Sequence, residues 1–277
     1  AGYFDSGPFT GGAGGGILCN GASPILDNLI IRNNTATGAG RYGGGIFVID
    51  GNISIQNCVV RNNSADGGGG VWIHGSSGSI KNSIIYENTT EGDPGASVNI
   101  ASSAYTTSVI NTVIYNNNKI GLSVVDGAGI NIVNSIIKNN ISSNDSVEIN
   151  IGSNATASVS YSMIPNELNA IYNDGNLIWG DGNLDTDPLF VDASNGDYRL
   201  SGHSPAIGAG TATGAPATDI VGNPRPSPAG STPDMGAYEN AQPNRRPLAG
   251  TITDGLGADV DWGNSTSTLS AAWDEFS

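Results

Sequence analysis

Charged residues are scarce in this chain. Asp, Glu, Lys and Arg make up 13% of its 277 residues, against about 25% in an average globular protein. Most of them are acidic, since 10 Lys and Arg stand against 25 Asp and Glu and give a net charge of −15. Nucleic-acid-binding proteins neutralise phosphates with clustered Lys and Arg. This composition therefore argues against a nucleic-acid partner.

Long apolar runs and cysteines are scarce as well. No run of 18 or more apolar residues occurs, so no transmembrane helix is expected. The two cysteines, Cys19 and Cys58, are too few for a disulfide framework, and we expect buried free thiols. The chain has instead many Asn, Ser and Thr residues and 41 glycines. Gly and Asn are weak helix formers, so the composition favours an all-β fold rich in turns.

One phrase recurs through the first part of the chain. It consists of Asn, a short residue, two aliphatic residues, a variable residue and then usually Asn-Asn. The copies are NLIIRNN, NCVVRNN, NSIIYEN, NTVIYNN and NSIIKNN, followed by a degraded YSMIPNE at Tyr161. Their starting points are 23 to 29 residues apart, close to one turn of a three-sided solenoid with corner loops of unequal length.

Two further apolar segments accompany each copy. An aliphatic residue stands two positions before the phrase, and an alternating segment, often preceded by glycines, lies further upstream. Alternation with period 2 predicts strands, so each repeat should supply one strand to each of three parallel sheets. The predicted inward columns are Ile17, Ile46, Val71, Val98, Leu122 and Val147; Leu26, Ile55, Ile80, Val109, Ile132 and Val159; and Ile31, Val60, Ile85, Ile114, Ile137 and Ile164.

The first Asn of each copy is predicted to lie at the bend between two sheets. Asn tolerates the left-handed backbone conformation that a tight bend needs, and stacked amides can bond from coil to coil. A structural role is therefore preferred over ligand binding for this bend ladder. Its members are Asn28, Asn57, Asn82, Asn111 and Asn134.

With this ladder and these columns, residues 14–167 resemble the right-handed parallel β-helix superfamily of pectate lyases, other polysaccharide-active enzymes and bacterial surface proteins. The resemblance implies a fold and not a reaction. A lyase would need a base near carboxylates, and a hydrolase would need paired carboxylates. The sequence shows no catalytic cluster of either kind among the outward carboxylates of the coils, which are Asp27, Asp50, Asp66 and Glu148.

Outward positions supply the candidate binding residues. The variable position of the phrase should form a column of cations and tyrosines beside an apolar stripe. This surface could bind an acidic glycan, a partner protein or the chain's own C-terminal segment, and the last is preferred. A second surface, Phe47 and Trp72 with Leu18 and His74 nearby, could stack on sugars or pack against loops. The column itself consists of Arg32, Arg61, Tyr86, Tyr115 and Lys138.

The sequence pattern changes after the coils. The strings DPLFVD at Asp187, NGDYRL at Asn195, SPAIGAG at Ser204, VGNPRP at Val221 and PDMGAYE at Pro233 resemble the C-terminal signature of the bacterial surface proteins called choice-of-anchor Q. That resemblance implies export and variable anchoring modules. We expect this segment to cover the open end of the solenoid, where strand edges lack partners, and to fold back along a sheet.

Four segments are therefore expected. Residues 1–167 form the coils, 168–240 form the C-terminal capping segment, and 241–253 form a polar, proline-containing linker. Residues 254–277 resemble the beginning of a fibronectin type III-like module, with Trp262 and Trp273 as strand aromatics.

A calcium site is predicted in the loop that follows the coils. Oxygen-bearing side chains stand there at alternate positions, as calcium prefers, although Asp and Asn are also ordinary turn residues. The predicted ligands are Asp181, Asn183, Asp185 and Asp187.

Three functions stay open at this point. The preferred one is a secreted or cell-surface β-helix that acts as a structural, adhesive or glycan-binding module, with a polysaccharide or a cell-surface protein as its partner. The first alternative is a polysaccharide lyase or glycoside hydrolase that acts on an acidic polysaccharide. The second is a subunit of an extracellular fibre, built by self-association through the solenoid ends.

Overall fold

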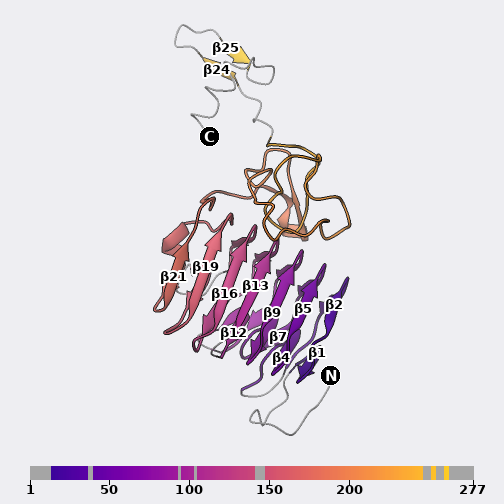
Figure 1. The fold of residues 1–277 in the computed structure, drawn as a ribbon. Coiled ribbons are helices and arrows are strands. Elements are labelled where there is room, and N and C mark those ends of the chain that lie inside the picture. Colours follow the sequence, from indigo (N-terminus) through magenta and orange to yellow (C-terminus); the bar gives the residue numbers. More distant parts are fainter. Residues whose placement is uncertain are drawn as a thin grey trace.

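The computed structural model describes residues 14–36, 40–92, 95–102, 105–140 and 147–245, and the backbone of 251–253 and 259–261. Its main body is a parallel β-helix, in which successive coils stack strand on strand (Figure 1). Each coil contributes one strand to each side of the helix until the last coils. The predicted all-β, three-sheet architecture is confirmed.

Three main sheets form the sides of the helix, and every pairing within them is parallel. Sheet A contains β1 (Ile17–Asn20), β4 (Ile46–Ile49), β8 (Val71–His74), β12 (Ala96–Ala101), β15 (Ile120–Val125), β18 (Ile149–Ile151) and β20 (Ile171–Asn173). Sheet B contains β2 (Ile25–Asp27), β5 (Ile53–Gln56), β9 (Gly78–Lys81), β13 (Thr106–Ile110), β16 (Gly129–Val133), β19 (Thr156–Ser160) and β21 (Asn176–Trp179). Sheet C contains β3 (Ile30–Arg32), β6 (Val59–Arg61), β10 (Ile84–Tyr86), β14 (Val113–Tyr115) and β17 (Ile136–Lys138).

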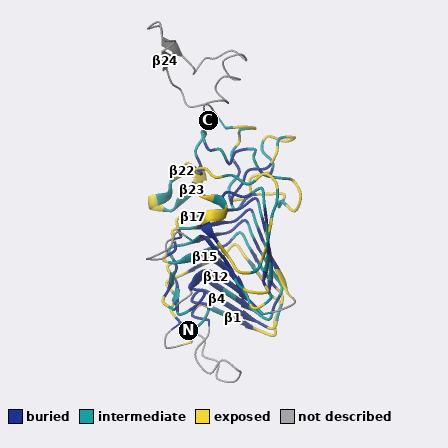
Figure 2. Ribbon diagram, turned by 90° about the vertical axis from the view of Figure 1, so that its left-hand side faces the viewer, coloured by how far each residue is buried: buried dark blue, intermediate teal, exposed yellow. Residues whose placement is uncertain are grey.

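Aliphatic residues fill the interior of the coils, which appears dark blue in Figure 2. The predicted inward columns follow the observed register except at one position. In sheet A, Leu122 pairs with Ile149 and not with Val147. The reason is Glu148, whose carboxylate turns to the corner and accepts hydrogen bonds from the backbone and side-chain N–H groups of Asn140 at 3.1 and 2.8 Å. The strand therefore begins two residues later than the pattern predicts.

The bend ladder has the predicted conformation. Its five asparagines have φ between 46° and 56°, in the left-handed region. A second left-handed bend closes sheet C in each coil. It falls on the first residue of the Asn-Asn pair or its equivalent, at Asn33, Asn62, Glu87, Asn116 and Asn139.

A buried Asn ladder, which the sequence interpretation missed, follows that second bend. It consists of the last Asn of each phrase. Asn117 shows the pattern: its Oδ1 accepts from the N and Nδ2 atoms of Asn88 at 2.9 and 3.1 Å, and its Nδ2 donates to Oδ1 of Asn140 at 2.7 Å. Bonded on both sides, these amides tie neighbouring coils together inside the corner. The members are Asn34, Asn63, Asn88, Asn117 and Asn140.

The coils continue past residue 167, the expected boundary. β20 and β21 extend sheets A and B by another coil, and Leu184 forms a bridge with Met163. This coil lacks the Asn phrase but keeps inward apolar residues at Ile171, Leu177 and Trp179.

Residues 185–245, here called the flank segment, add no strand to the open edges of β20 and β21 at the end of the helix. They fold back along the side of the helix, orange in Figure 1, and pack on the outer face of sheet C. The expected end cover is therefore wrong, whereas the expected folding back along a sheet is confirmed. The cause is the phrase itself, since its two consecutive aliphatic residues make sheet C apolar on both faces.

Other expectations concern the cysteines and the C-terminal end. Cys19 and Cys58 are buried free thiols, as predicted.

β24 (Thr251–Thr253), within the expected linker, pairs antiparallel with β25 (Asp259–Asp261). The rest of the expected fibronectin-like module, with Trp262 and Trp273, lies outside the described residues. Over the ranges given above, no helix is long and apolar enough to cross a membrane.

The buried Asn ladder predicts a large difference between two asparagine substitutions. Asn117→Ala leaves the backbone N–H of Asn88 without its acceptor and also breaks the side-chain bonds to Asn88 and Asn140; an orphaned buried group costs about 1–3 kcal/mol. We expect a loss of about 2–4 kcal/mol in the free energy of unfolding, measured by denaturant titration. Asn131→Ala, on the exposed outer side of β16, should change it by less than about 0.5 kcal/mol. Equal losses would contradict the role of the ladder.

Candidate functional site

The outer face of sheet C carries an apolar stripe, formed by the first aliphatic residue of each phrase: Ile30, Val59, Ile84, Val113 and Ile136. Its last three members are buried against Tyr198, Leu200, Ile207 and Met235 of the flank segment. Of the three occupants considered from the sequence, the chain's own C-terminal segment is the one that the structure shows.

The neighbouring column of cations and tyrosines is divided by this packing. Tyr86 and Tyr115 contact Tyr198 with ring centroids 5.0 and 5.2 Å apart, and Tyr115 contacts Phe190 at 5.5 Å. Lys138 forms a 2.5 Å ion pair with Asp187. These three predicted binding residues therefore contact the flank segment, and the rings of Tyr86 and Tyr115 pack against its aromatic residues.

Arg32 and Arg61, the members of the column in β3 and β6, lie outside the part of sheet C that the flank segment covers. Arg32 is exposed. The guanidinium of Arg61 lies 5.9 Å from the ring centroid of Tyr86 and donates to Oδ1 of Asn62 at 2.8 Å. Here the predicted column stays at the surface.

The bend ladder also holds the flank segment. The side-chain amides of Asn82, Asn111 and Asn134 donate to backbone carbonyls of Thr218, Asp234 and Thr211 at 2.6, 2.9 and 2.8 Å. Asn134 Oδ1 also accepts from the Thr211 N–H at 2.8 Å. The ladder therefore forms hydrogen bonds between coil and flank segment as well as within the coils.

The second predicted aromatic surface lies on the outer side of sheet A. Phe47 is only 1% exposed and belongs to a small cluster with Leu18, Tyr42 and Trp72. The rings of Tyr42 and Trp72 are 4.2 Å apart. His74 is half-buried on the same strand as Trp72. These aromatics pack on one another and present no open stacking platform.

Three of the four predicted calcium ligands bind other groups of the chain, and the fourth is exposed. Asn183 accepts from the Ser162 N–H and donates to the carbonyls of Val159 and Gly180. Asp185 accepts from the Asn166 N–H, Asp187 pairs with Lys138, and Asp181 is exposed. No group of three or more His, Cys, Asp or Glu side chains in the described ranges could hold a metal ion. Calcium binding stays a sequence-based prediction that these contacts do not support.

A buried charged cluster organises the flank segment. The guanidinium of Arg225 donates to the backbone carbonyls of Asp234, Gly236 and Ala237 at 3.1 to 3.2 Å, and its Nε lies 3.5 Å from the Glu239 carboxylate. Arg225 thus donates to three carbonyls of a segment that belongs to no strand. This explains why an arginine stands in the VGNPRP string.

Three carboxylates complete the cluster by accepting from backbone N–H groups. Asp219 accepts from Val221, Asn223 and Glu239, Asp234 from Gly208 and Asn240, and Glu239 from Ser227 and Asp234. Burial and the neighbouring Glu239 carboxylate raise the pKa of Asp234 to about 7. Burial likewise raises the pKa of Glu239 and lowers that of Arg225. These groups are structural acceptors and donors within a segment that has little regular secondary structure.

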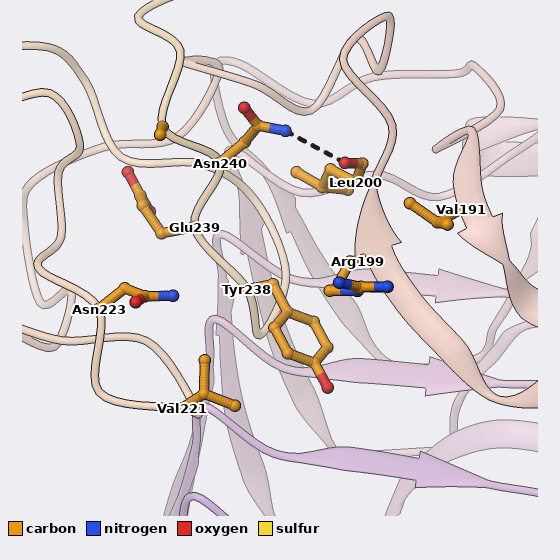
Figure 3. Close-up of a pocket in the computed structure, with 9 residues that line it drawn as sticks. Val191, Arg199, Leu200, Val221, Asn223, Tyr238, Glu239 and Asn240 are labelled. Carbon is orange, nitrogen blue, oxygen red and sulfur yellow. Dashed lines mark hydrogen bonds between the residues drawn. The ribbon is translucent and has the colours of Figure 1, made fainter.

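A cavity of about 310 Å³ opens beside this cluster (Figure 3). It lies between the hairpin of β22 (Phe190–Asp192) and β23 (Asp197–Leu200) and the loops around residues 221–223 and 238–241. Four of the five signature strings contribute to its wall. The lining residues are Val191, Arg199, Leu200, Val221, Asn223, Tyr238, Glu239, Asn240 and Ala241.

The cavity combines an aromatic ring with oriented polar groups. Tyr238 is half-buried and directs its ring between Val221 and Arg199 (Figure 3). The amides are fixed, since Asn240 donates to the Leu200 carbonyl and Asn223 donates to the Asp219 carboxylate, both at 3.1 Å. Arg199 forms a bidentate pair with Asp197 at 2.8 and 2.5 Å. Aromatic and apolar walls with a few placed polar groups are typical of small-ligand sites.

A second hollow, of about 260 Å³, lies at the corner after sheet C. Its wall is polar and contains no aromatic residue, so it offers hydrogen bonds but no stacking surface. The lining residues are Glu87, Asn88, Thr89, Asn116, Asn117, Asn118 and Asn139.

Sequence reasoning did not single out Arg199, Asn223 or Tyr238. The available signal was the set of strings in which they stand, which the sequence resemblance had already grouped together. Their meeting depends on how irregular loops fold back onto sheet C, which no periodicity predicts.

Comparison with known proteins concerns the coils. A family model described as a right-handed beta helix region matches residues 15–183. The match ends near Leu184, where the bridge with Met163 closes the last coil. No curated protein sequence matches the chain.

The charged cluster predicts that Arg225→Ala unfolds the flank segment before the coils. Removing one partner of a buried ion pair costs about 3–5 kcal/mol, and three carbonyls each lose one of their two donors. Hydrogen exchange followed by mass spectrometry should show faster exchange in peptides from residues 204–240 and unchanged exchange in β13 and β16. Arg199→Ala, at an exposed ion pair, serves as the control. Unchanged exchange in the Arg225 variant would be incompatible with this role.

The pKa of Asp234 predicts a pH dependence of stability. The pKa of Asp234 rises from 3.8, the ordinary value of an aspartate, to about 7 in the folded chain, so the folded state binds the proton more tightly. The stabilisation from protonation is complete below pH 3.8 and is lost as the pH rises toward 7. The melting temperature of the wild type should therefore fall between pH 3.8 and about pH 7 more steeply than that of Asp234→Asn. A steeper fall in the variant would refute the assignment.

Proposed function

Because the chain belongs to the right-handed β-helix family, we propose that it is a surface-displayed module that binds a glycan in the cavity beside Tyr238. One observation carries the proposal: a half-buried tyrosine ring, flanked by two fixed amides and a guanidinium, lines an open cavity of about 310 Å³. Sugars present an apolar face that stacks on aromatic rings and hydroxyl groups that need both donors and acceptors. The cavity is at the small end of the size range of ligand sites.

The charges favour a neutral glycan. Arg199, the cation of the wall, is already paired with Asp197, and the chain carries a net charge of −15. A field of this sign repels an acidic polymer. The glycan proposed here is therefore a neutral sugar at a chain end or side branch, in contrast to the acidic polysaccharide considered from the sequence.

Export and surface attachment belong to the same proposal. The signature strings that resemble choice-of-anchor Q proteins form one folded unit, since Arg225, Asp234 and Glu239 bind one another's loops. A unit of this kind fits the placement of an anchoring module after the coils.

A catalytic function is not proposed. The carboxylates that lie together in the flank segment, Asp219, Asp234 and Glu239, are buried and occupied by backbone N–H groups. Of the three, Glu239 alone lines the cavity, whereas acid and base catalysis of hydrolysis needs a pair of carboxylates at the substrate.

A glycan array with the purified chain, followed by calorimetric titration of the best neutral hit, tests the proposal. Tyr238→Ala should weaken binding at least about tenfold, as expected for loss of a central aromatic contact. Arg199→Gln should weaken it less, because that guanidinium is shared with Asp197. Tyr172→Ala is the matched control, since Tyr172 is an exposed tyrosine in β20 whose hydroxyl bonds Asp174.

Two outcomes would reject this function. One is an array without a neutral hit that a folded chain binds reproducibly. The other is equal loss of binding in the Tyr238 and Tyr172 variants, which would place the site elsewhere. Unchanged hydrogen exchange in residues 204–240 must accompany the Tyr238 result, because that ring also packs on the flank segment core.

A further inference from the structure

The last coil ends in an open strand edge. Among the described residues, β21 pairs with β19 on one side and with no strand on the other, and Figure 1 shows it at the outer end of the row of strands. The N–H groups of Asn176 and Gly180 donate to carbonyls of the preceding coil. Successive residues direct their backbone groups to opposite edges of a strand, so those of Leu177 and Trp179 face the open edge.

β21 also carries an isoleucine where the preceding coils carry polar residues. Ile178 is 52% exposed. Leu177 and Trp179, which point inward, are only partly buried, because no further coil stacks on them. The end of the helix therefore presents apolar side chains beside free backbone groups. The polar members of the outward column that leads to Ile178 are Ser54, Ser79, Ser108, Asn131 and Ser158.

Nothing in the sequence of β21 protects this edge. Proteins usually keep open edges from pairing with charged residues or proline. The four residues of β21 are Asn, Leu, Ile and Trp. At the other end of sheet B, by contrast, β2 contains the exposed carboxylate of Asp27 and follows Pro24. Of the two ends of sheet B, the β21 edge is the one suited to pairing with another strand.

We infer that β21 of one copy of the chain pairs with β21 of a second copy, antiparallel, about a two-fold axis that passes through the Ile178 position at right angles to the helix axis. Ile178 of each copy then faces Ile178 of the other. Leu177 of each copy lies opposite Trp179 of the other, where their free N–H and C=O groups bond as in an antiparallel ladder. The inward side chains join the two cores end to end, and the contact is self-complementary, as two-fold symmetry requires.

The flank segments leave room for this contact. Each packs on the outer face of sheet C, against Ile84, Val113 and Ile136, and Figure 1 shows it set back from β21. An axis through the middle of sheet B exchanges the sides on which sheets A and C lie. The flank segment of one copy therefore lies on the side of sheet A of the other, and the two flank segments do not meet.

A second copy fits this edge better than an unrelated strand because free backbone groups and apolar side chains are arranged symmetrically about Ile178. The same axis brings no charged residue of β21 into the contact, since the strand has none. A joint of two coil ends is smaller than a standard interface of about 800 Å² per partner. We therefore expect a dimer that dissociates in the micromolar range. This inference does not depend on the glycan site, which lies on the flank segment.

Sedimentation analysis of the intact chain over a range of micromolar concentrations tests the inference. The wild type should form dimers. Ile178→Asp and Ile178→Lys should each raise the dimer dissociation constant at least about tenfold, because like charges then stand directly opposite each other. Ile25→Asp is the matched control: Ile25 is 70% exposed and ends the same outward column at the other end of the helix, so its substitution should leave the dimer unchanged.

Mixing the two Ile178 variants gives a readout specific to the two-fold axis. An equimolar mixture of Ile178→Asp and Ile178→Lys should form dimers again, because opposite charges then face each other across the axis. A wild type that stays monomeric at every concentration overturns the inference. So does a mixture that stays monomeric, or a dimer that Ile25→Asp weakens as much as Ile178→Asp does, which would indicate head-to-tail stacking. Unchanged circular dichroism of each variant shows that the loss of dimer is not a loss of fold.

Discussion

The rest of the structure depends on one constraint: sheet C has an apolar surface on both sides. Each phrase carries two consecutive aliphatic residues, such as Ile84 and Ile85, and in a strand consecutive residues point to opposite faces. Ile85 fills the interior, so Ile84 must be covered from outside. The flank segment supplies that cover with Tyr198, Ile207 and Met235. Hydrophobic burial therefore fixes where the C-terminal part of the chain lies.

Docking onto sheet C then shapes the candidate site. Because the flank segment has few strands, its backbone polar groups are satisfied by side chains: Arg225 and three carboxylates inside it, and the amides of the bend ladder below it. Buried backbone groups need such partners. The loops held in this way leave the cavity beside Tyr238 on their outer side. Binding chemistry is thus carried by irregular loops on a regular scaffold.

The regular part of the fold was predictable because it follows from period and stacking. The sequence predicted the inward columns, the bend asparagines and the buried thiols. It missed the shift from Val147 to Ile149, where Glu148 closes the buried Asn ladder, and the coil of β20 and β21, which lacks the Asn phrase. The cavity beside Tyr238 could not be predicted from the sequence. Tyr86 and Tyr115 are chemically suited to sugars, but whether a ring is free depends on what packs on it. This packing depends on loop geometry. In the fold, Tyr198 packs against the ring of Tyr86, and Phe190 packs against the ring of Tyr115.

The central claim is that the flank segment is bound to the outer face of sheet C. The backbone N–H of Gly236 donates to the Asn134 carbonyl at 2.7 Å and so joins the two directly. Residue-resolved hydrogen exchange of the intact chain measures this bond. The account predicts that the Gly236 amide is protected to a degree comparable with amides of β14. Exchange at the rate of an exposed loop, while β14 stays protected, would contradict it.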